Sequence, residues 1–155
     1  MLLYLIRHAE AADIVPDEAR PLTARGRHQV ASLAEFLQRS REFHPAAVWH
    51  SPLVRARETA QLLLRGLSST TPLREVPNIT PDDDPHEIVP ALASHLPPLA
   101  LVGHEPYLSA LASLLVTGAT YPVAFAMKKG AVLALERGPA NRWIVRWHVE
   151  PDLFA

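Results

Sequence analysis

Short apolar runs alternate along the chain with segments of helical periodicity. Four of the runs have the length and composition of buried strands, at residues 2–6, 46–50, 73–76 and 98–103. The intervening segments carry apolar side chains at helical spacing and predict helices over residues 24–41, from 52 onward, over 85–95 and over 106–118. Thr23 and Asp84 are typical capping residues for the first and third of these helices.

Strands that alternate with helices favour a mostly parallel sheet covered by helices on both faces. Two further apolar runs, 131–136 and 143–149, flank the turn sequence Gly138-Pro-Ala-Asn141 and predict a terminal hairpin, which adds at least one antiparallel strand at an edge. The sequence therefore predicts an α/β fold, a three-layer αβα sandwich whose mostly parallel sheet carries a C-terminal antiparallel hairpin. Because no repeat or linker interrupts the pattern, we expect residues 1–155 to form a single domain.

The composition excludes several classes of protein. The chain has no cysteine, which excludes a disulfide framework, a thiolate zinc site and a cysteine nucleophile. Its 15 basic and 16 acidic residues give a net charge of −1, which argues against a nucleic-acid surface and against a polybasic membrane patch. The apolar run from Leu2 to Ile6 is too short for a signal peptide or a membrane span. We therefore expect a cytoplasmic protein, with a monomer as the simplest state.

Candidate chemistry follows three of the predicted strands. Arg7 and His8 come directly after the first strand, Ser51 and then Arg55 follow the second, and His104 follows the fourth. In open parallel sheets, ligands bind beyond the C-terminal ends of the strands, so these side chains can meet at one sheet edge. Each of these residues alone is typical of a surface or loop position. Their joint placement after three strands favours a functional site.

Two arginines and two histidines at one edge of the sheet indicate a site that binds an anion. Guanidinium groups match phosphate oxygens in a bidentate way, and helix N-termini near Ser51 and Glu105 would add backbone N–H donors. Nearby positive charge disfavours the protonated form of His8, and a neutral imidazole can attack phosphorus. The remaining histidines have no metal-ligand spacing, so we expect no metal and no cofactor.

Three motifs in this order resemble the histidine phosphatase superfamily, which has the phosphoglycerate mutase-like fold. They are the runs Leu5-Ile6-Arg7-His8-Ala9-Glu10, Ser51-Pro52-Leu-Val-Arg55-Ala-Arg-Glu-Thr59-Ala60 and Leu101-Val-Gly-His104-Glu-Pro106. Alanine at position 9 replaces the usual glycine of the first motif. The resemblance implies that His8 is the phosphorylated nucleophile and that Arg7, Arg55 and His104 complete a phosphate-binding catalytic pocket.

Within this superfamily the chain is most similar to the compact phosphohistidine phosphatases of the SixA group. The similarity rests on the short length and on the segments Arg20-Pro-Leu-Thr23, Ile79-Thr-Pro-Asp82 and Lys128-Lys-Gly-Ala131. It implies that Arg20 contacts the substrate phosphate or its carrier protein. An equal alternative is that Arg20 is a solvated loop residue with no contact to the substrate.

The sequence leaves the identity of the general acid open. Larger members of the superfamily place a glutamate after the third strand, and Glu75 stands in a segment that looks superficially similar. An alternative register through Ile79-Thr-Pro81 puts proline there and leaves Asp82 and Asp84 nearby, although such aspartates are usually turn and cap residues. A missing strong acid would fit a substrate with a nitrogen–phosphorus bond, because imidazole leaves more readily than an alkoxide.

The preferred hypothesis is a phosphatase that works through a covalent phosphohistidine and acts on a histidine-phosphorylated protein, such as a phosphotransfer domain. One alternative is a phosphomonoesterase for a small phosphoester with the same chemistry. Another is a non-catalytic phosphate-binding adaptor, which the intact set of Arg7, His8, Arg55 and His104 argues against.

Overall fold

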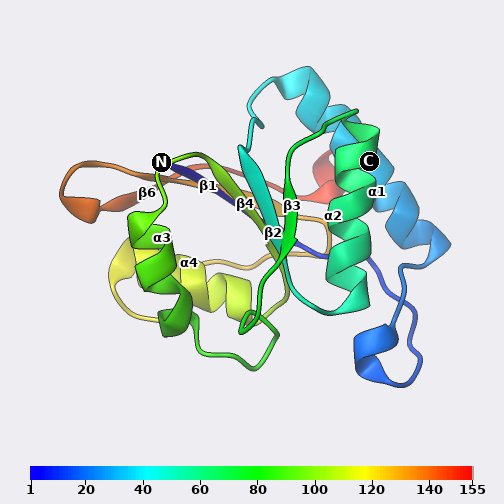
Figure 1. The fold of residues 1–155 in the computed structure, drawn as a ribbon, viewed down its shortest axis with the longest axis horizontal. Helices are drawn as coiled ribbons and strands as arrows, with labels where there is room; N and C mark the ends of the chain where they lie inside the picture. The colour runs from blue at the N-terminus through cyan, green and yellow to red at the C-terminus, as the bar shows by residue number, and fades with distance from the viewer. Residues whose placement is uncertain (155) are drawn as a thin grey trace.

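The computed structural model of the chain describes residues 1–154. Its six strands form one sheet (Figure 1), and they are β1 (Leu2–Arg7), β2 (Ala47–His50), β3 (Leu73–Glu75), β4 (Leu99–Gly103), β5 (Val132–Arg137) and β6 (Trp143–Val149). Its α-helices are α1 (Ala24–Ser40), α2 (Val54–Gly66), α3 (Val89–Ser94) and α4 (Tyr107–Thr117). Four short 3₁₀ turns complete the elements, namely η1 (Asp17–Ala19), η2 (Pro85–Ile88), η3 (Pro139–Asn141) and η4 (Pro151–Leu153).

The sheet has the strand order β3-β2-β4-β1-β5-β6. The four strands β1 to β4 run parallel, whereas β5 pairs antiparallel with β1, and β6 pairs antiparallel with β5 at the edge. This arrangement confirms the expected mostly parallel sheet with a C-terminal antiparallel hairpin. The insertion of β4 between β1 and β2 decides the position of the candidate site, because it brings three polar strand ends next to one another.

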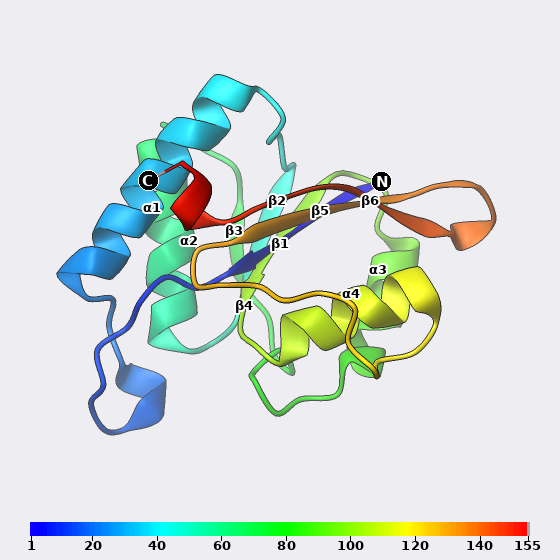
Figure 2. The same ribbon diagram turned by 180° about the vertical axis from the view of Figure 1, so that it is seen from behind.

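Helices cover both faces of the sheet, as the αβα prediction requires (Figures 1 and 2). Helices α1 and α2 pack on one face over a cluster that includes Tyr4, Leu33 and Leu63. Helix α4 and the turn η2 pack on the other face over a cluster that includes Leu5 and Leu111. None of the helices within residues 1–154 has the length and apolar composition that crossing a membrane requires.

Two of the predicted helices differ from the observed ones, one in its first residue and the other in its continuity. Helix α2 begins at Val54 and not at Pro52, because Leu53 has an extended backbone (φ −72°, ψ 140°) and donates its N–H to Ser51 Oγ. The segment predicted as one helix over 85–95 is the turn η2 followed by α3. Pro90 has no N–H to donate and stands in the first turn of α3, where it marks a new helix start.

Gly26 allows α1 to approach the chain just after His8. A Cβ atom at this position would lie 2.1 Å from the carbonyl oxygen of Glu10, which accepts the N–H of Thr23 at 3.0 Å. Gln29 of the same helix accepts the N–H of Glu10 through its side-chain oxygen, at 2.9 Å. Helix α1 therefore fixes the segment that follows the candidate nucleophile.

We predict that Gly26→Ala lowers the free energy of unfolding by about 1–3 kcal/mol, the usual cost of an overpacked site. The backbone clash outweighs the roughly 0.5–1 kcal/mol that alanine gains over glycine inside a helix. Urea unfolding measures the change, and Gly138→Ala is the matched control, because its nearest contact would be an ordinary 3.6 Å. Equal stability of the two variants would contradict the close approach.

Candidate active site

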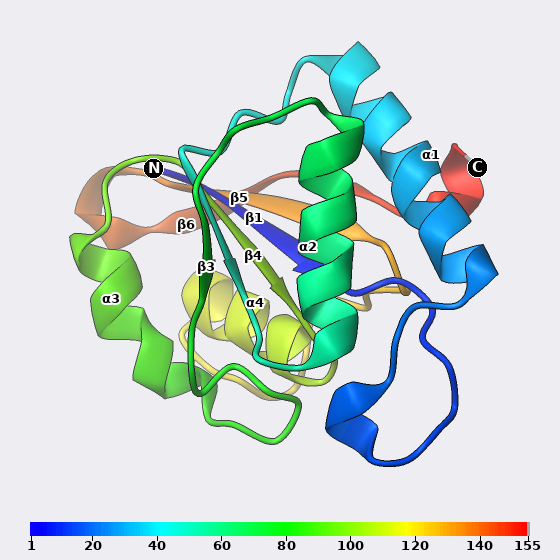
Figure 3. The ribbon, with the colours of Figure 1, turned by 45° about the vertical axis from the view of Figure 1, so that its right-hand side comes forward.

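The pairing of β4 with β1 and β2 brings three strand ends together. Arg7 of β1 is opposite Gly103 of β4, and His50 of β2 is opposite Val102. The residues that follow, His8, Ser51 and His104, therefore leave the sheet side by side at one edge. Figure 3 shows these strand ends beside the N-terminal end of α2 and the loop that carries η1.

His8 is held by its backbone and by one ring nitrogen. Its N–H donates to the Gly103 carbonyl (2.9 Å), and its own carbonyl accepts the N–H of Gly130 (3.2 Å). Its ring Nδ1 lies 2.7 Å from the carbonyl oxygen of Ala9. A carbonyl oxygen can only accept, so Nδ1 carries the hydrogen of the neutral ring and Nε2 keeps the free lone pair. His8 is thus prepared to act as a nucleophile at Nε2.

His104 packs against His8 and is oriented by Ser51. The two imidazole rings lie 5.1 Å apart between centroids. Nε2 of His104 lies 2.7 Å from Ser51 Oγ, which also accepts the N–H of Leu53 (3.2 Å). When the serine hydroxyl donates to Nε2, Nδ1 carries the ring hydrogen, and within residues 1–154 this buried Nδ1 has no hydrogen-bond partner. His104 can therefore offer one donor to an anion.

Arg7 and Arg55 each keep an unpaired donor at the same edge. One terminal nitrogen of Arg7 donates to the Met127 carbonyl (2.7 Å), and those of Arg55 donate to the carbonyl oxygen of Asp17 (3.0 Å) and to its carboxylate (3.3 Å). The Nε atoms of both arginines are buried and have no partner within residues 1–154. Arg55 is only 4% exposed, so its guanidinium group is fixed before any ligand binds.

Asp17 is a residue of this region that the sequence analysis missed. It stands in the turn η1 and accepts from both Arg55 and Arg20, with Arg20 Nη1 at 3.1 Å. The Nε of Arg20 donates to the carbonyl oxygen of Ala12 (2.7 Å), so this side chain is engaged inside its own loop. The spacing of three residues between Asp17 and Arg20 is common for ion pairs, and it is the signal in the sequence that could have pointed to Asp17.

Thr59 connects the candidate nucleophile to the helix of Arg55. Its hydroxyl donates to the Arg55 carbonyl (2.7 Å) and accepts the N–H of Ala9 (3.1 Å), and the side chain is fully buried. The threonine of the second sequence motif therefore fixes the spacing between the turn after His8 and the first turn of α2.

Burial and positive charge keep both histidines neutral. The pKa of His8 is lowered to about 4, first by burial and then by the charges of Arg55, Arg7 and Lys129. The pKa of His104 is lowered to about 3, again first by burial and then by His8 and Arg55. The sequence analysis attributed neutrality to the arginines alone, whereas removal from water is the larger cause.

The lowered pKa of His8 predicts a pH-dependent stability. The folded pKa lies below the unfolded value of about 6.5, so the unfolded chain binds the extra proton and stability falls as pH drops from about 6.5 to about 4. Between pH 6.5 and pH 5, His8 accounts for a loss of about 2 kcal/mol in the free energy of unfolding. Denaturant unfolding at pH 7 and pH 5 should show a smaller loss for His8→Gln than for the wild type. An equal loss in both would contradict a depressed pKa at His8.

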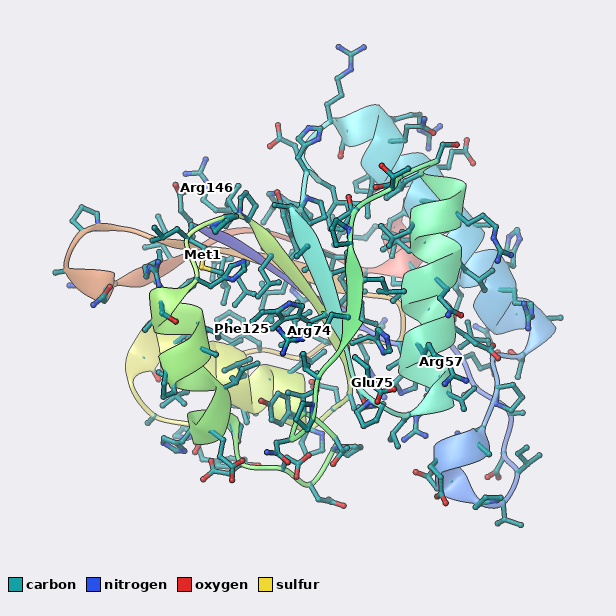
Figure 4. The ribbon with its side chains drawn as sticks, in the orientation of Figure 1. Met1, Arg57, Arg74, Glu75, Phe125 and Arg146 are labelled. Atoms are coloured by element: carbon teal, nitrogen blue, oxygen red, sulfur yellow. The ribbon has the colours of Figure 1, made fainter. Side chains whose placement is uncertain are left out.

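The carboxylates weighed as general acids are occupied or exposed. The Oδ1 of Asp84 accepts from the N–H and the Nδ1 of His86, and these hydrogen bonds lower the pKa of Asp84, which favours an ionised group that has no proton to donate. Asp82 is exposed in the loop before η2, and Glu75 is exposed at the end of the edge strand β3 (Figure 4). The neighbouring Asp83 accepts from the N–H and the hydroxyl of Thr80. Within residues 1–154, no three histidine or carboxylate side chains are grouped as metal ligands.

The chain matches one family model and a curated relative. The family model of the histidine phosphatase superfamily (branch 1) matches residues 3–80. An uncharacterized protein of Picosynechococcus is 30% identical over 165 residues, which cover 99% of this chain and 94% of the relative.

Solved structures share the fold at lower identity. A protein histidine phosphatase SixA in complex with tungstate superposes with a TM-score of 0.87 at 23% identity and covers 99% of both chains. An alpha-ribazole phosphatase from Shigella flexneri superposes with a TM-score of 0.78 at 20% identity, over 94% of this chain and 95% of that one. A mycobacterial glucosyl-3-phosphoglycerate phosphatase has a TM-score of 0.71 at 17% identity, over 94% and 96%. These similarities establish the shared fold.

Proposed function

Because the chain belongs to the histidine phosphatase superfamily, we propose that it hydrolyses a phosphorylated protein histidine through a covalent phosphohistidine on His8. The observation that carries this proposal is a set of buried donors that have no hydrogen-bond partner among the described residues 1–154, namely Arg7 Nε, Arg55 Nε and His104 Nδ1. An unpaired buried donor is costly, and a phosphoryl group brings several acceptor oxygens at once. Three such donors around one neutral imidazole fit a phosphate pocket.

In the proposed reaction, Nε2 of His8 attacks phosphorus while the bond from phosphorus to the leaving group breaks. Arg7, Arg55 and His104 stabilise the charge on the equatorial oxygens, as fixed donors do in a water-poor site. The leaving group takes a proton from solvent water, and a water molecule then attacks the phosphorus bound to His8. This second step releases inorganic phosphate and restores the neutral imidazole, held in the same tautomer by the Ala9 carbonyl.

The nature of the candidate acids supports phosphohistidine as the substrate. Asp84 is favoured in its ionised form, while Asp82 and Glu75 are exposed. An imidazole leaving group needs less protonation than an alkoxide, so a site without a strong acid is better suited to a nitrogen–phosphorus bond. We also propose that residues 1–155 act as one domain, which is supported by the single sheet whose strands span Leu2 to Val149.

A substrate panel tests the proposal. We expect a phosphohistidine protein and phosphoramidate to be hydrolysed with kcat/KM values at least about tenfold above phosphoserine, phosphotyrosine and sugar phosphates. Such a ratio corresponds to about 1.4 kcal/mol of transition-state discrimination. Faster hydrolysis of a small phosphoester would replace the proposed substrate with a metabolite and leave the phosphohistidine chemistry in place.

A further inference from the structure

A cavity of about 370 Å³ borders the candidate site and shares Arg7 with it. Its charged wall has four cations and two carboxylates, namely Arg7, Arg25, Lys128, Lys129, Glu10 and Asp152. The volume is at the lower end for small-ligand pockets, so it is suited to a side chain or another small group. Apart from Arg7, none of the residues that line this cavity has a role in the phosphoryl transfer described above.

The cations of this cavity are not equally free. Lys128 Nζ lies 2.8 Å from Asp152 and 3.6 Å from Glu150, so its charge is already compensated. The Nε of Arg25 is 3.9 Å from a Glu10 oxygen, at the limit of an ion pair, and this side chain is 77% exposed. Lys129 makes no ion pair within residues 1–154. Since Arg7 is assigned to the phosphoryl group, Arg25 and Lys129 are the cations of this cavity that remain available to a further ligand.

The backbone next to Lys129 is fixed relative to the nucleophile. The next residue, Gly130, donates its N–H to the carbonyls of both Arg7 (3.1 Å) and His8 (3.2 Å). In the other direction, the N–H of Arg7 donates to the Ala131 carbonyl (3.1 Å). The charge of Lys129 reaches His8, since it is among the causes that lower the pKa of that histidine. These backbone hydrogen bonds therefore hold residue 129 next to the segment that carries His8.

We propose that this cavity binds a carboxylate of the phosphorylated protein, an aspartate or glutamate near the phosphohistidine, through Lys129 and Arg25. This inference rests on the proposed function, since it assigns the neighbourhood of the phosphohistidine in the substrate. The net positive wall complements an acidic neighbour, and its position next to Arg7 is where the substrate beyond the phosphoryl group can reach. The acidic residue would thus contribute to the choice of carrier protein.

Two synthetic phosphohistidine peptides test this inference. They are identical except that glutamates flank the phosphohistidine in one and glutamines in the other. We expect the wild type to prefer the glutamate peptide by about fivefold in kcat/KM, the scale of a partly exposed ion pair. The preference should shrink in 1 M salt, where the screening length falls to about 3 Å.

Charge variants assign the preference to Lys129. Lys129→Ala should reduce it towards equality, and Lys129→Glu should reverse it in favour of the glutamine peptide. Arg39→Ala is the matched control, because it removes an exposed, ion-paired cation from the end of α1, outside the cavity, and should keep the full preference.

The outcomes separate this inference from the proposed function. Equal hydrolysis of the two peptides by the wild type, or a preference that survives Lys129→Glu, would overturn the acidic subsite alone. If the wild type hydrolysed an aryl phosphate but neither peptide, the protein-phosphohistidine function would fall and the subsite with it.

Discussion

His8→Ala is expected to lower phosphatase turnover by at least about 10³-fold, because loss of a nucleophile removes the covalent route altogether. The wild type should carry a trapped phosphoryl label that is stable in alkali and lost in acid, as expected for a phosphohistidine. The variant should carry no label. It should still bind inorganic phosphate, because Arg7, Arg55 and His104 keep the donors that have no partner in the described part of the chain.

The control for this prediction is His28→Ala, which removes an exposed imidazole from α1. Its turnover and labelling should match the wild type. If His8→Ala kept full activity, or if the label remained in that variant, the covalent mechanism would be wrong.

Arg55→Ala is expected to lower kcat/KM by about 10²–10³-fold, the usual loss when a fixed charge-stabilising donor is removed. The guanidinium group is buried and held by both the carbonyl and the carboxylate of Asp17, so it needs no reorganisation when the phosphoryl group arrives. Arg55→Lys should recover only part of the loss, because an ammonium group keeps the charge but not the planar fork.

The matched control is Arg57→Ala, on the same helix and labelled in Figure 4. Residues two apart on a helix face different directions, so Arg57 does not share the environment of Arg55. Steady-state kinetics and thermal unfolding of each variant separate lost catalysis from lost folding. An Arg55→Ala enzyme that is folded and within about threefold of wild-type kcat/KM would rule out Arg55 as a phosphate ligand.

The positions of the fold elements were largely predictable, because each depends on local pattern. The strands have the expected positions to within one or two residues, and Thr23 caps α1 by accepting the N–H of Gly26, as a capping threonine should. The errors occurred where one side chain changes the backbone. Ser51 Oγ takes the N–H of Leu53 and delays the start of α2, and Pro90 starts a new helix where one continuous helix was expected.

The sequence by itself determined the fold class and the residue types at the strand ends, because apolar periodicity and motif spacing are properties of neighbouring residues. Only the tertiary structure decided that β4 lies between β1 and β2, that Asp17 holds Arg55, and that the charge of Lys129, which has no ion pair within residues 1–154, acts on His8. It also decided the tautomer of His8 and the burial that keeps its pKa low. These properties depend on contacts between segments far apart in the chain and on the exclusion of water, which no local pattern encodes.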